Sequence, residues 1–222
     1  MTDEWYLENK FYDYTGNSFN SSIGHFTQMI WKDTKKVGFG FSLDDDGNFY
    51  VVANYFPAGN YKNKFKENVI PVKIRNPEYL SNSTKPKREE PKEKNQFLKA
   101  MMSEVLQTNK KNNERDKCER SPLNKNSNVA SRQTPNVNQM NQFDDVQLRF
   151  INEALECHNE CREIHGVEPL LHNSVLSKIA QSYADHLASI NRMTHSKNTY
   201  KNEKLGENLA YAFDSRVDFY SG

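Results

Sequence analysis

A long polar stretch, residues 74–144, divides this chain into two segments, neither of which can form a complete layered domain alone. The stretch is rich in Lys, Glu, Asn, Ser and Pro, so it cannot bury enough apolar area to offset the entropy lost on ordering it. Residues 1–73 are aromatic-rich and strand-like, and they include a mostly apolar run at 25–31. Residues 145–222 have mainly helical patterns. Because strands without covering helices and helices without a sheet both leave apolar faces open, the two segments are expected to cover each other.

The first segment contains the pattern of a β-hairpin. Two apolar runs, 37–41 and 49–55, flank an acidic turn that ends at Gly47. Within the second run, residues 50–53 are apolar on both faces, as expected for a central strand that is covered on both sides. Upstream of the hairpin, Trp5–Tyr12 has the pattern of the end of a helix.

The second segment contains the patterns of two helices. The first helix is indicated by apolar residues and one histidine at a 3.6-residue period: Phe150, Ile151, Leu155 and His158. Asn173 or Ser174 is a suitable N-cap for the second helix. That helix then has one apolar stripe, formed by Val175, Leu176, Ile179, Ala180, Tyr183, Ala184, Leu187 and Ala188.

Composition excludes several classes of function and structure. The net charge of +1 argues against nucleic acid as a partner. There is no run of 18 apolar residues, so no membrane span is expected, and the first residues lack the pattern of a signal peptide. The three cysteines form no disulfide framework, and Cys157 and Cys161 are interpreted as small apolar residues of a helix.

Two motifs in the first segment resemble the signatures of a known family. These are GHFTQMIW at 24–31 and YVVANYFPAGNY at 50–61. They are similar to the C-terminal half of the CAP superfamily domain, which is found in pathogenesis-related, antigen 5 and cysteine-rich secretory proteins. Residues 153–212, including GENLA at 206–210, resemble the N-terminal half of the same domain.

The resemblance implies an α+β fold of the CAP type, a three-layer α-β-α sandwich whose two halves occur here in reversed order. Residues 1–73 would be the C-terminal half, residues 74–144 a disordered basic linker, and residues 145–222 the N-terminal half. Either the chain is a fragment of a tandem CAP protein or it closes on itself as a circular permutant. A flexible linker of this length spans roughly 45 Å, and a domain of this size has a diameter of about 40 Å, so closure is feasible. We favour the fragment, because both ends break inside elements of the family pattern.

Within the family, the runs at 31–38 and 55–60 are similar to the Golgi-associated branch of pathogenesis-related proteins. Ala53 occupies a position where secreted members usually have a disulfide-forming cysteine, which fits an intracellular protein. The resemblance therefore implies an intracellular location at the Golgi membrane surface. The alternative is an extracellular protein whose signal peptide is missing from a truncated chain.

Four residues match positions of the family's central cavity: Glu8, His25, His195 and Glu207. Neutral imidazoles bind divalent metals such as Zn²⁺, so the resemblance implies that His25 and His195 are metal ligands. The two carboxylates would hold the remaining ring N–H groups or a bound water molecule. The cavity can exist only where the two segments meet, within one chain or between two.

A second site is implied by an aromatic pattern. Tyr12, Tyr14 and Phe19 resemble a caveolin-binding-type motif, which in some family members is linked to sterol binding. Aromatic side chains on a loop can hold a flat apolar ligand. The alternative interpretation is a loop that packs its own aromatic rings together.

Three hypotheses about function follow. The first is a non-enzymatic CAP module that binds a metal and a lipid, sterol or protein partner, a second CAP chain included. The second is a metal-dependent hydrolase in which the His/Glu quartet serves as general acid and base. No Ser or Cys nucleophile beside a base is evident, so an acyl-enzyme is unsupported. The third is a tandem-protein fragment that acts only when paired with other CAP chains.

Overall fold

A computed structural model of the chain describes residues 1–16, 20–72 and 137–212, and of residues 137–144 it describes the backbone only. The chain divides into two compact units, and residues 1–84 and 149–222 together form the first of them. Most of the predicted linker, 74–136, lies outside the described residues, as do Phe19 and Cys118. The description below concerns the first unit, to which both predicted segments contribute.

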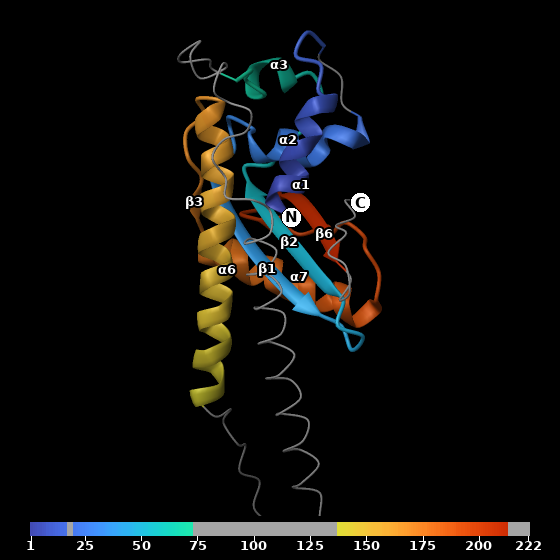
Figure 1. The fold of residues 1–222 in the computed structure, drawn as a ribbon, viewed down its shortest axis with the longest axis vertical. Coiled ribbons are helices and arrows are strands. Elements are labelled where there is room, and N and C mark those ends of the chain that lie inside the picture. The colour runs from blue at the N-terminus through green and yellow to red at the C-terminus, as the bar shows by residue number, and fades with distance from the viewer. Residues whose placement is uncertain (17–19, 73–136, 213–222) are drawn as a thin grey trace, which may run out of the picture. The chain divides into compact units, whose positions relative to one another are not determined.

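A four-stranded mixed sheet lies at the centre of this unit, in the order β3-β1-β2-β6 (Figure 1). The predicted hairpin is confirmed as β1 (Lys36–Leu43) antiparallel to β2 (Phe49–Phe56). On its other side β2 pairs antiparallel with β6 (Gly206–Ala212), and β3 (Leu171–His172) is parallel to the start of β1. The strand predicted to be central is therefore central, and its neighbours come from both segments.

The remaining elements are helices and one small ribbon. The first segment forms α1 (Thr2–Leu7), α2 (Gly24–Met29), α3 (Phe65–Asn68) and the 3₁₀ turns η1 (Glu8–Phe11) and η2 (Ser21–Ile23). The second segment forms α6 (Val137–Ile164), α7 (Ser174–Ile190) and the β4–β5 ribbon (Thr199–Tyr200 and Glu203–Lys204). None of the helices within the described parts of the chain is long and apolar enough to cross a bilayer.

Helix α7 packs on one face of the sheet. Its residues Ala180, Ala184 and Leu187 form a buried cluster with Val52 and Leu209 from β2 and β6. Close approach is possible because β1 has glycines beneath the helix. A Cβ atom added at Gly38 would lie 2.1 Å from the backbone nitrogen of Ser177, and one at Gly40 would lie 2.2 Å from that of Gln181. A larger side chain at either position would force the helix away.

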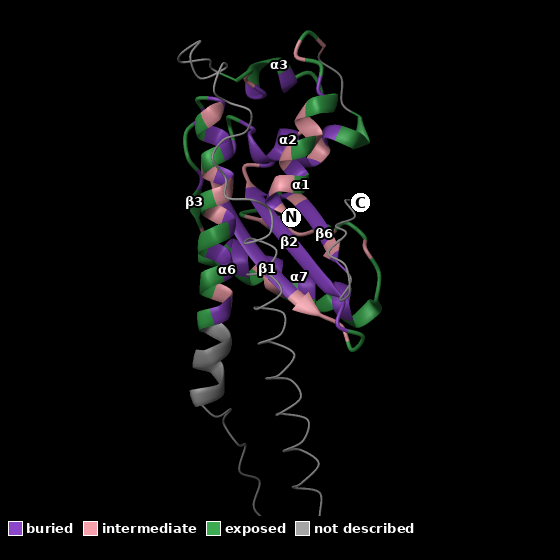
Figure 2. Ribbon diagram, in the orientation of Figure 1, coloured by how far each residue is buried: buried purple, intermediate pink, exposed green. Residues whose placement is uncertain are grey.

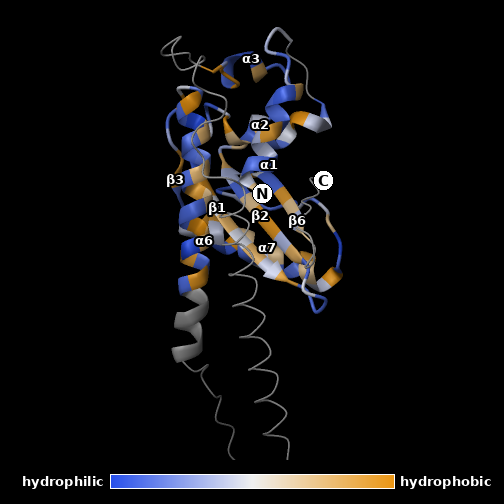
Figure 3. Cartoon of the chain, in the orientation of Figure 1, coloured by the Kyte–Doolittle hydropathy of each residue, from blue (hydrophilic) through white to orange (hydrophobic). Residues whose placement is uncertain are grey.

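Aromatic rings from both segments pack on the opposite face of the sheet. Phe150 of α6 lies 4.9 Å from Phe41 and 6.5 Å from Phe39, measured between ring centroids. Figure 2 shows β1, β2 and β6 as mostly buried, and Figure 3 shows hydrophobic residues along the same strands. The fold is therefore a mixed α+β fold in which a four-stranded sheet packs against helices.

Three local features differ from the sequence-based expectations. The run at 25–31 was grouped with the strand-like residues. Most of it forms α2, and the side chains of residues 25–29 are buried there. The second segment, expected to be mainly helical, contributes strand β6, which is buried on both faces and so lacks the alternation of a half-exposed strand. Helix α6 begins at Val137, eight positions before the expected start of this segment.

The stripe predicted on α7 is only partly buried. Leu176, Ala180, Ala184 and Leu187 face the sheet, whereas Val175 is 47% exposed. The predicted cap is confirmed, since the Asn173 side chain accepts a hydrogen bond of 3.0 Å from the backbone N–H of Leu176.

A buried arginine joins the two segments beside the sheet. Arg162 of α6 is fully buried and donates to the backbone carbonyls of Met29 (3.0 Å), Trp31 (2.9 Å) and Thr34 (3.1 Å). Its Nε also donates to the carbonyl of Glu168 at 2.7 Å. One planar guanidinium thus donates to four backbone carbonyls, three of them in the first segment.

Replacing Arg162 by alanine is expected to lower the free energy of unfolding by about 3 kcal/mol or more, because it leaves buried carbonyls without donors and opens a cavity. Urea unfolding followed by circular dichroism measures the change. Arg192→Ala removes an exposed arginine and serves as the control, with an expected effect within about 0.5 kcal/mol. Equal midpoints for the two variants would contradict the role given to Arg162.

Candidate functional site

The Glu8 carboxylate connects the end of α1 to the start of α2. Its Oε2 accepts hydrogen bonds from the backbone N–H groups of His25 (2.9 Å) and Phe26 (3.0 Å). Its Oε1 lies 2.7 Å from Nδ1 of the His25 ring. One side chain therefore satisfies two N–H groups in the first turn of α2 and holds the imidazole.

A second carboxylate–imidazole pair is formed entirely by the other segment. Oε1 of Glu207, on β6, lies 2.9 Å from Nδ1 of His195 in the loop after α7. The same carboxylate accepts hydrogen bonds from the backbone N–H of Ser196 (2.8 Å) and from its hydroxyl (2.6 Å). The His195 side chain is 59% exposed, whereas that of Glu207 is 7% exposed, so the imidazole lies at the surface above a mostly buried carboxylate.

Both imidazoles are thus held in the same way. An ionised carboxylate can only accept hydrogen bonds, so Nδ1 of each ring is the protonated nitrogen. In the neutral ring the lone pair is then on Nε2. Each pair therefore offers one imidazole nitrogen that can accept a proton or bind a metal.

The two pairs are linked through β6 and α2. Asn208, next to Glu207, donates from Nδ2 to the backbone carbonyl of His25 at 3.1 Å. The indole of Trp5 stacks on the His25 ring, with centroids 5.7 Å apart and planes at 13°. Its Nε1 also donates to the carbonyl of Leu209 at 3.2 Å. The four predicted residues thus belong to two connected pairs, and each carboxylate holds the imidazole of its own segment.

Metal ligation by a larger set of side chains is not seen in the part of the chain that the structure describes. No group of three or more His, Cys, Asp or Glu residues there is arranged to hold a metal ion. A metal at this site would depend on the two imidazoles, with its other ligands supplied from outside the protein.

A buried polar network lies behind the site, around the histidine that the sequence pattern placed on the first helix of the second segment. His158 Nδ1 lies 2.6 Å from the carbonyl of Ala154, and its Nε2 lies 2.8 Å from the hydroxyl of Tyr55. Asn208 also donates to that hydroxyl, at 3.1 Å. A carbonyl can only accept, so Nδ1 carries the proton and Nε2 accepts from Tyr55.

Burial sets the charge states of this network. The pKa of His158 is lowered to about 4, mainly by desolvation of the ring and also by the positive charge of Arg162, while the hydrogen bond to the Ala154 carbonyl acts in the opposite direction. Burial also raises the pKa of Tyr55 well above its usual value. Both groups are therefore neutral at physiological pH.

One buried amide near the site has no protein partner among the described residues. Asn54 is fully buried on β2, directly opposite Glu207 in the strand register, and neither Nδ2 nor Oδ1 makes a hydrogen bond within the described parts of the chain. A buried amide is costly unless it is satisfied. The spacing of motifs gave no signal for this residue, because its unusual state arises only from packing.

The aromatic loop packs mainly on itself. Tyr12 is 8% exposed, and its ring lies 4.7 Å from that of Tyr14 and 5.9 Å from that of Phe26. Burial raises the pKa of Tyr14 to about 12. Of the three predicted ligand-binding aromatics, Tyr12 and Tyr14 therefore lie together, with Tyr12 facing the protein.

Comparison with known proteins gives matches to one family. Residues 1–55 match the CAP family, described as the cysteine-rich secretory protein family. Golgi-associated plant pathogenesis-related protein 1 of Homo sapiens is 51% identical over 75 residues, which cover 33% of this chain and 49% of the human protein. Protein PRY2 of Saccharomyces cerevisiae is 42% identical over 71 residues, 32% of this chain and 22% of the yeast protein. The matched region thus spans about half or less of the length of these relatives.

Because burial lowers the pKa of His158, the free energy of unfolding of this protein is expected to depend on pH. Between about pH 6.5 and 4 the unfolded chain binds a proton at this ring and the folded chain does not, so the free energy of unfolding falls as pH falls through this window. At about 1.4 kcal/mol per pH unit, the loss from pH 6.5 to pH 5 is about 2 kcal/mol. Urea unfolding at pH 7 and pH 5 measures the decrease in the free energy of unfolding between the two pH values. This decrease is expected to be about 2 kcal/mol smaller in His158→Gln than in the wild type. His186→Gln, at an exposed position, is the control, and equal losses in all three proteins would contradict the prediction.

Proposed function

We propose that this chain, whose residues 1–55 match the CAP family, is a non-enzymatic binding module that holds a divalent metal ion such as Zn²⁺ through His25 and His195. The architecture proposed for it is the three-layer α-β-α sandwich of that family. The observation that carries the proposal is the repeated carboxylate–imidazole pair, at 2.7 Å for Glu8–His25 and 2.9 Å for His195–Glu207.

The chemistry of these pairs fits a zinc site. Metal-binding histidines usually donate their second ring N–H to a carboxylate or a carbonyl, which fixes the tautomer and makes the other nitrogen a better ligand. Both imidazoles here have that support. A bound Zn²⁺ would offer its remaining coordination positions to oxygen or nitrogen donors of a ligand.

A hydrolase using the same quartet is the alternative, and the carboxylates argue against it. Glu8 accepts three hydrogen bonds from the first turn of α2 and the His25 ring. Glu207 accepts three from His195 and Ser196. Carboxylates held in this way position their neighbours, whereas a general base must be available to accept a proton from a substrate or a water molecule.

We also propose that the two segments of this chain close on each other within one molecule, the alternative to pairing with other CAP chains. Both segments contribute to one compact unit, and the central strand β2 has one neighbour from each. Buried groups of the second segment, such as Arg162, have their hydrogen-bond partners in the first.

Calorimetric titration with ZnCl₂ tests the metal proposal. The wild-type chain is expected to bind one Zn²⁺, and His25→Ala and His195→Ala are each expected to weaken binding at least tenfold because each removes a ligand. Glu207→Gln is expected to weaken it by about 10-fold to 100-fold through loss of support for His195. His186→Ala, an exposed histidine outside the pairs, should leave the affinity unchanged.

Unchanged affinity in both His25→Ala and His195→Ala would refute the metal site. Zinc-dependent ester hydrolysis that is lost in the same two variants would instead favour the hydrolase.

A second proposed function is contact with a lipid surface, and it rests on exposed apolar side chains beside the aromatic loop. Leu7 is 52% exposed and Phe11 is 59% exposed, one turn apart across the end of α1 and the η1 turn. The ammonium of Lys10 lies 4.8 Å from the centroid of the Phe11 ring. Apolar side chains with a neighbouring cation suit an interface with anionic lipid. The name of the human relative places that protein at the Golgi, and we propose the Golgi membrane surface for this chain as well.

Sedimentation with phosphatidylcholine vesicles that contain phosphatidylserine and cholesterol tests this contact. Phe11→Ser is expected to reduce the partition coefficient about tenfold, as burial of a large apolar side chain is worth about 1.5–3 kcal/mol. Tyr61→Ser, which also changes an exposed aromatic residue, is the control. Equal binding by the two variants would exclude Phe11 as a lipid contact.

A further inference from the structure

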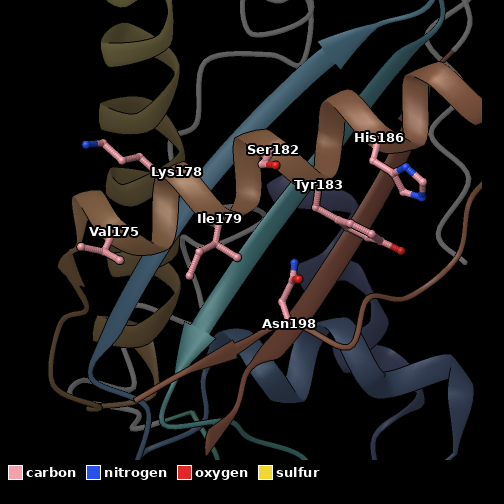
Figure 4. A pocket seen from close by; sticks show the side chains of 7 residues that line it. All are labelled: Val175, Lys178, Ile179, Ser182, Tyr183, His186 and Asn198. Atoms are coloured by element: carbon pink, nitrogen blue, oxygen red, sulfur yellow. The ribbon is translucent and has the colours of Figure 1, made fainter. Parts of the chain in front are cut away.

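The outer face of α7 and the loop that follows it form a groove whose lining includes none of the four His/Glu residues, although Asn198 is linked to Glu207 through the Ser196 hydroxyl. The groove has a volume of about 410 Å³ and is lined by Val175, Lys178, Ile179, Ser182, Tyr183, His186 and Asn198. Figure 4 shows Asn198 beside the side chains of Ile179 and Tyr183, whereas Lys178 extends from α7 away from Asn198. Its size lies within the range of pockets that hold small ligands or side chains of a peptide.

The groove includes the part of the apolar stripe of α7 that does not pack against the sheet. Leu176, Ala180 and Leu187 are used in packing against the strands. Val175 remains 47% exposed, and Ile179 and Tyr183, four and eight positions further, are only half-buried. These three side chains give the groove an apolar floor that the described part of the fold leaves uncovered.

The polar groups of the groove favour an anionic partner. Lys178 provides an ammonium group, and the His186 ring provides an N–H donor in either charge state. The seven lining residues include no Asp or Glu. The neighbouring carboxylate of Asp185 is held by Gln181, whose Nε2 donates to it at 2.9 Å.

One end of the groove is rigid. The hydroxyl of Tyr183 donates to the backbone carbonyl of Thr194 at 2.6 Å and so ties the helix to the loop. The rings of Tyr183 and His186 pack with centroids 5.7 Å apart and planes at 33°. A ligand that reaches this end meets a preformed aromatic surface, which lowers the entropic cost of binding.

Spacing along the helix limits the shape of the partner. Lys178 and His186 are eight residues apart, which is about 12 Å along the axis at about 1.5 Å per residue. An extended peptide covers that distance in about four residues, at about 3.3 Å per residue. In an extended chain, residues two and four positions apart lie on the same face.

From these features we propose that the groove binds an extended acidic peptide segment of the pattern acidic–x–apolar–x–acidic. The two carboxylates pair with Lys178 and His186, and the apolar side chain between them packs on Ile179 and Tyr183. The site is a protein-interaction site in addition to the proposed metal site, and it does not depend on metal binding.

Fluorescence anisotropy with a rhodamine-labelled peptide, Glu-Thr-Leu-Thr-Glu, tests the proposal on the full chain. The wild type is expected to bind the peptide, and Lys178→Glu is expected to weaken binding at least tenfold. Lys62→Glu makes the same charge change at an exposed lysine outside the groove and should bind as the wild type does. A second peptide, Lys-Thr-Leu-Thr-Glu, has one glutamate replaced by lysine. It is expected to bind Lys178→Glu more tightly than the first peptide does, because its lysine can pair with the glutamate introduced at position 178.

Three results would overturn the proposal. The first is no binding by the wild type at millimolar peptide, and the second is equal binding by the two lysine variants. The third is Lys178-dependent binding to phosphatidylserine vesicles without binding of the peptide, which would assign the groove to a membrane. Because the zinc titration uses other residues and another readout, failure of one proposal leaves the other intact.

Discussion

The pairing of β2 with β6 is the interaction on which the rest of this fold depends. Strand β2 is buried on both faces and is flanked by β1 from its own segment and by β6 from the other. Without β6, the backbone N–H and C=O groups along that edge of β2 would be buried without partners, at a cost of about 1–3 kcal/mol each. The two segments are therefore parts of one folding unit, although a long polar stretch separates them in the sequence.

Polar side chains make the join between the segments specific. Arg162 donates to carbonyls of the first segment, Asn208 donates to the carbonyl of His25, and His158 pairs with Tyr55. Apolar surfaces can slide over each other with little change in energy, whereas a displaced buried hydrogen bond leaves unsatisfied groups. These contacts therefore define how the sheet and helices meet, and they also place the two carboxylate–imidazole pairs.

Much of the candidate site was predictable, because its residues lie in recognisable motifs. Glu8, His25, His195 and Glu207 were all identified from the sequence, and the structure pairs each carboxylate with one imidazole. Residues beyond the motifs were not predictable. Asn54 is unusual because it is buried without a hydrogen-bond partner among the described residues, and the groove on α7 arises because part of an apolar stripe stays uncovered.

Local structure was predictable from the sequence: the β1–β2 hairpin, the central position of β2, the Asn173 cap and the amphipathic helices. These follow from short-range patterns, since period, turn chemistry and capping involve residues a few positions apart. Long-range packing instead accounts for the helix within the run at 25–31, the strand at 206–212 and the burial of particular histidines. Those outcomes depend on contacts such as Asn208–His25, which joins residues 183 positions apart. No local pattern encodes such a contact, because its energy exists only after both segments have packed.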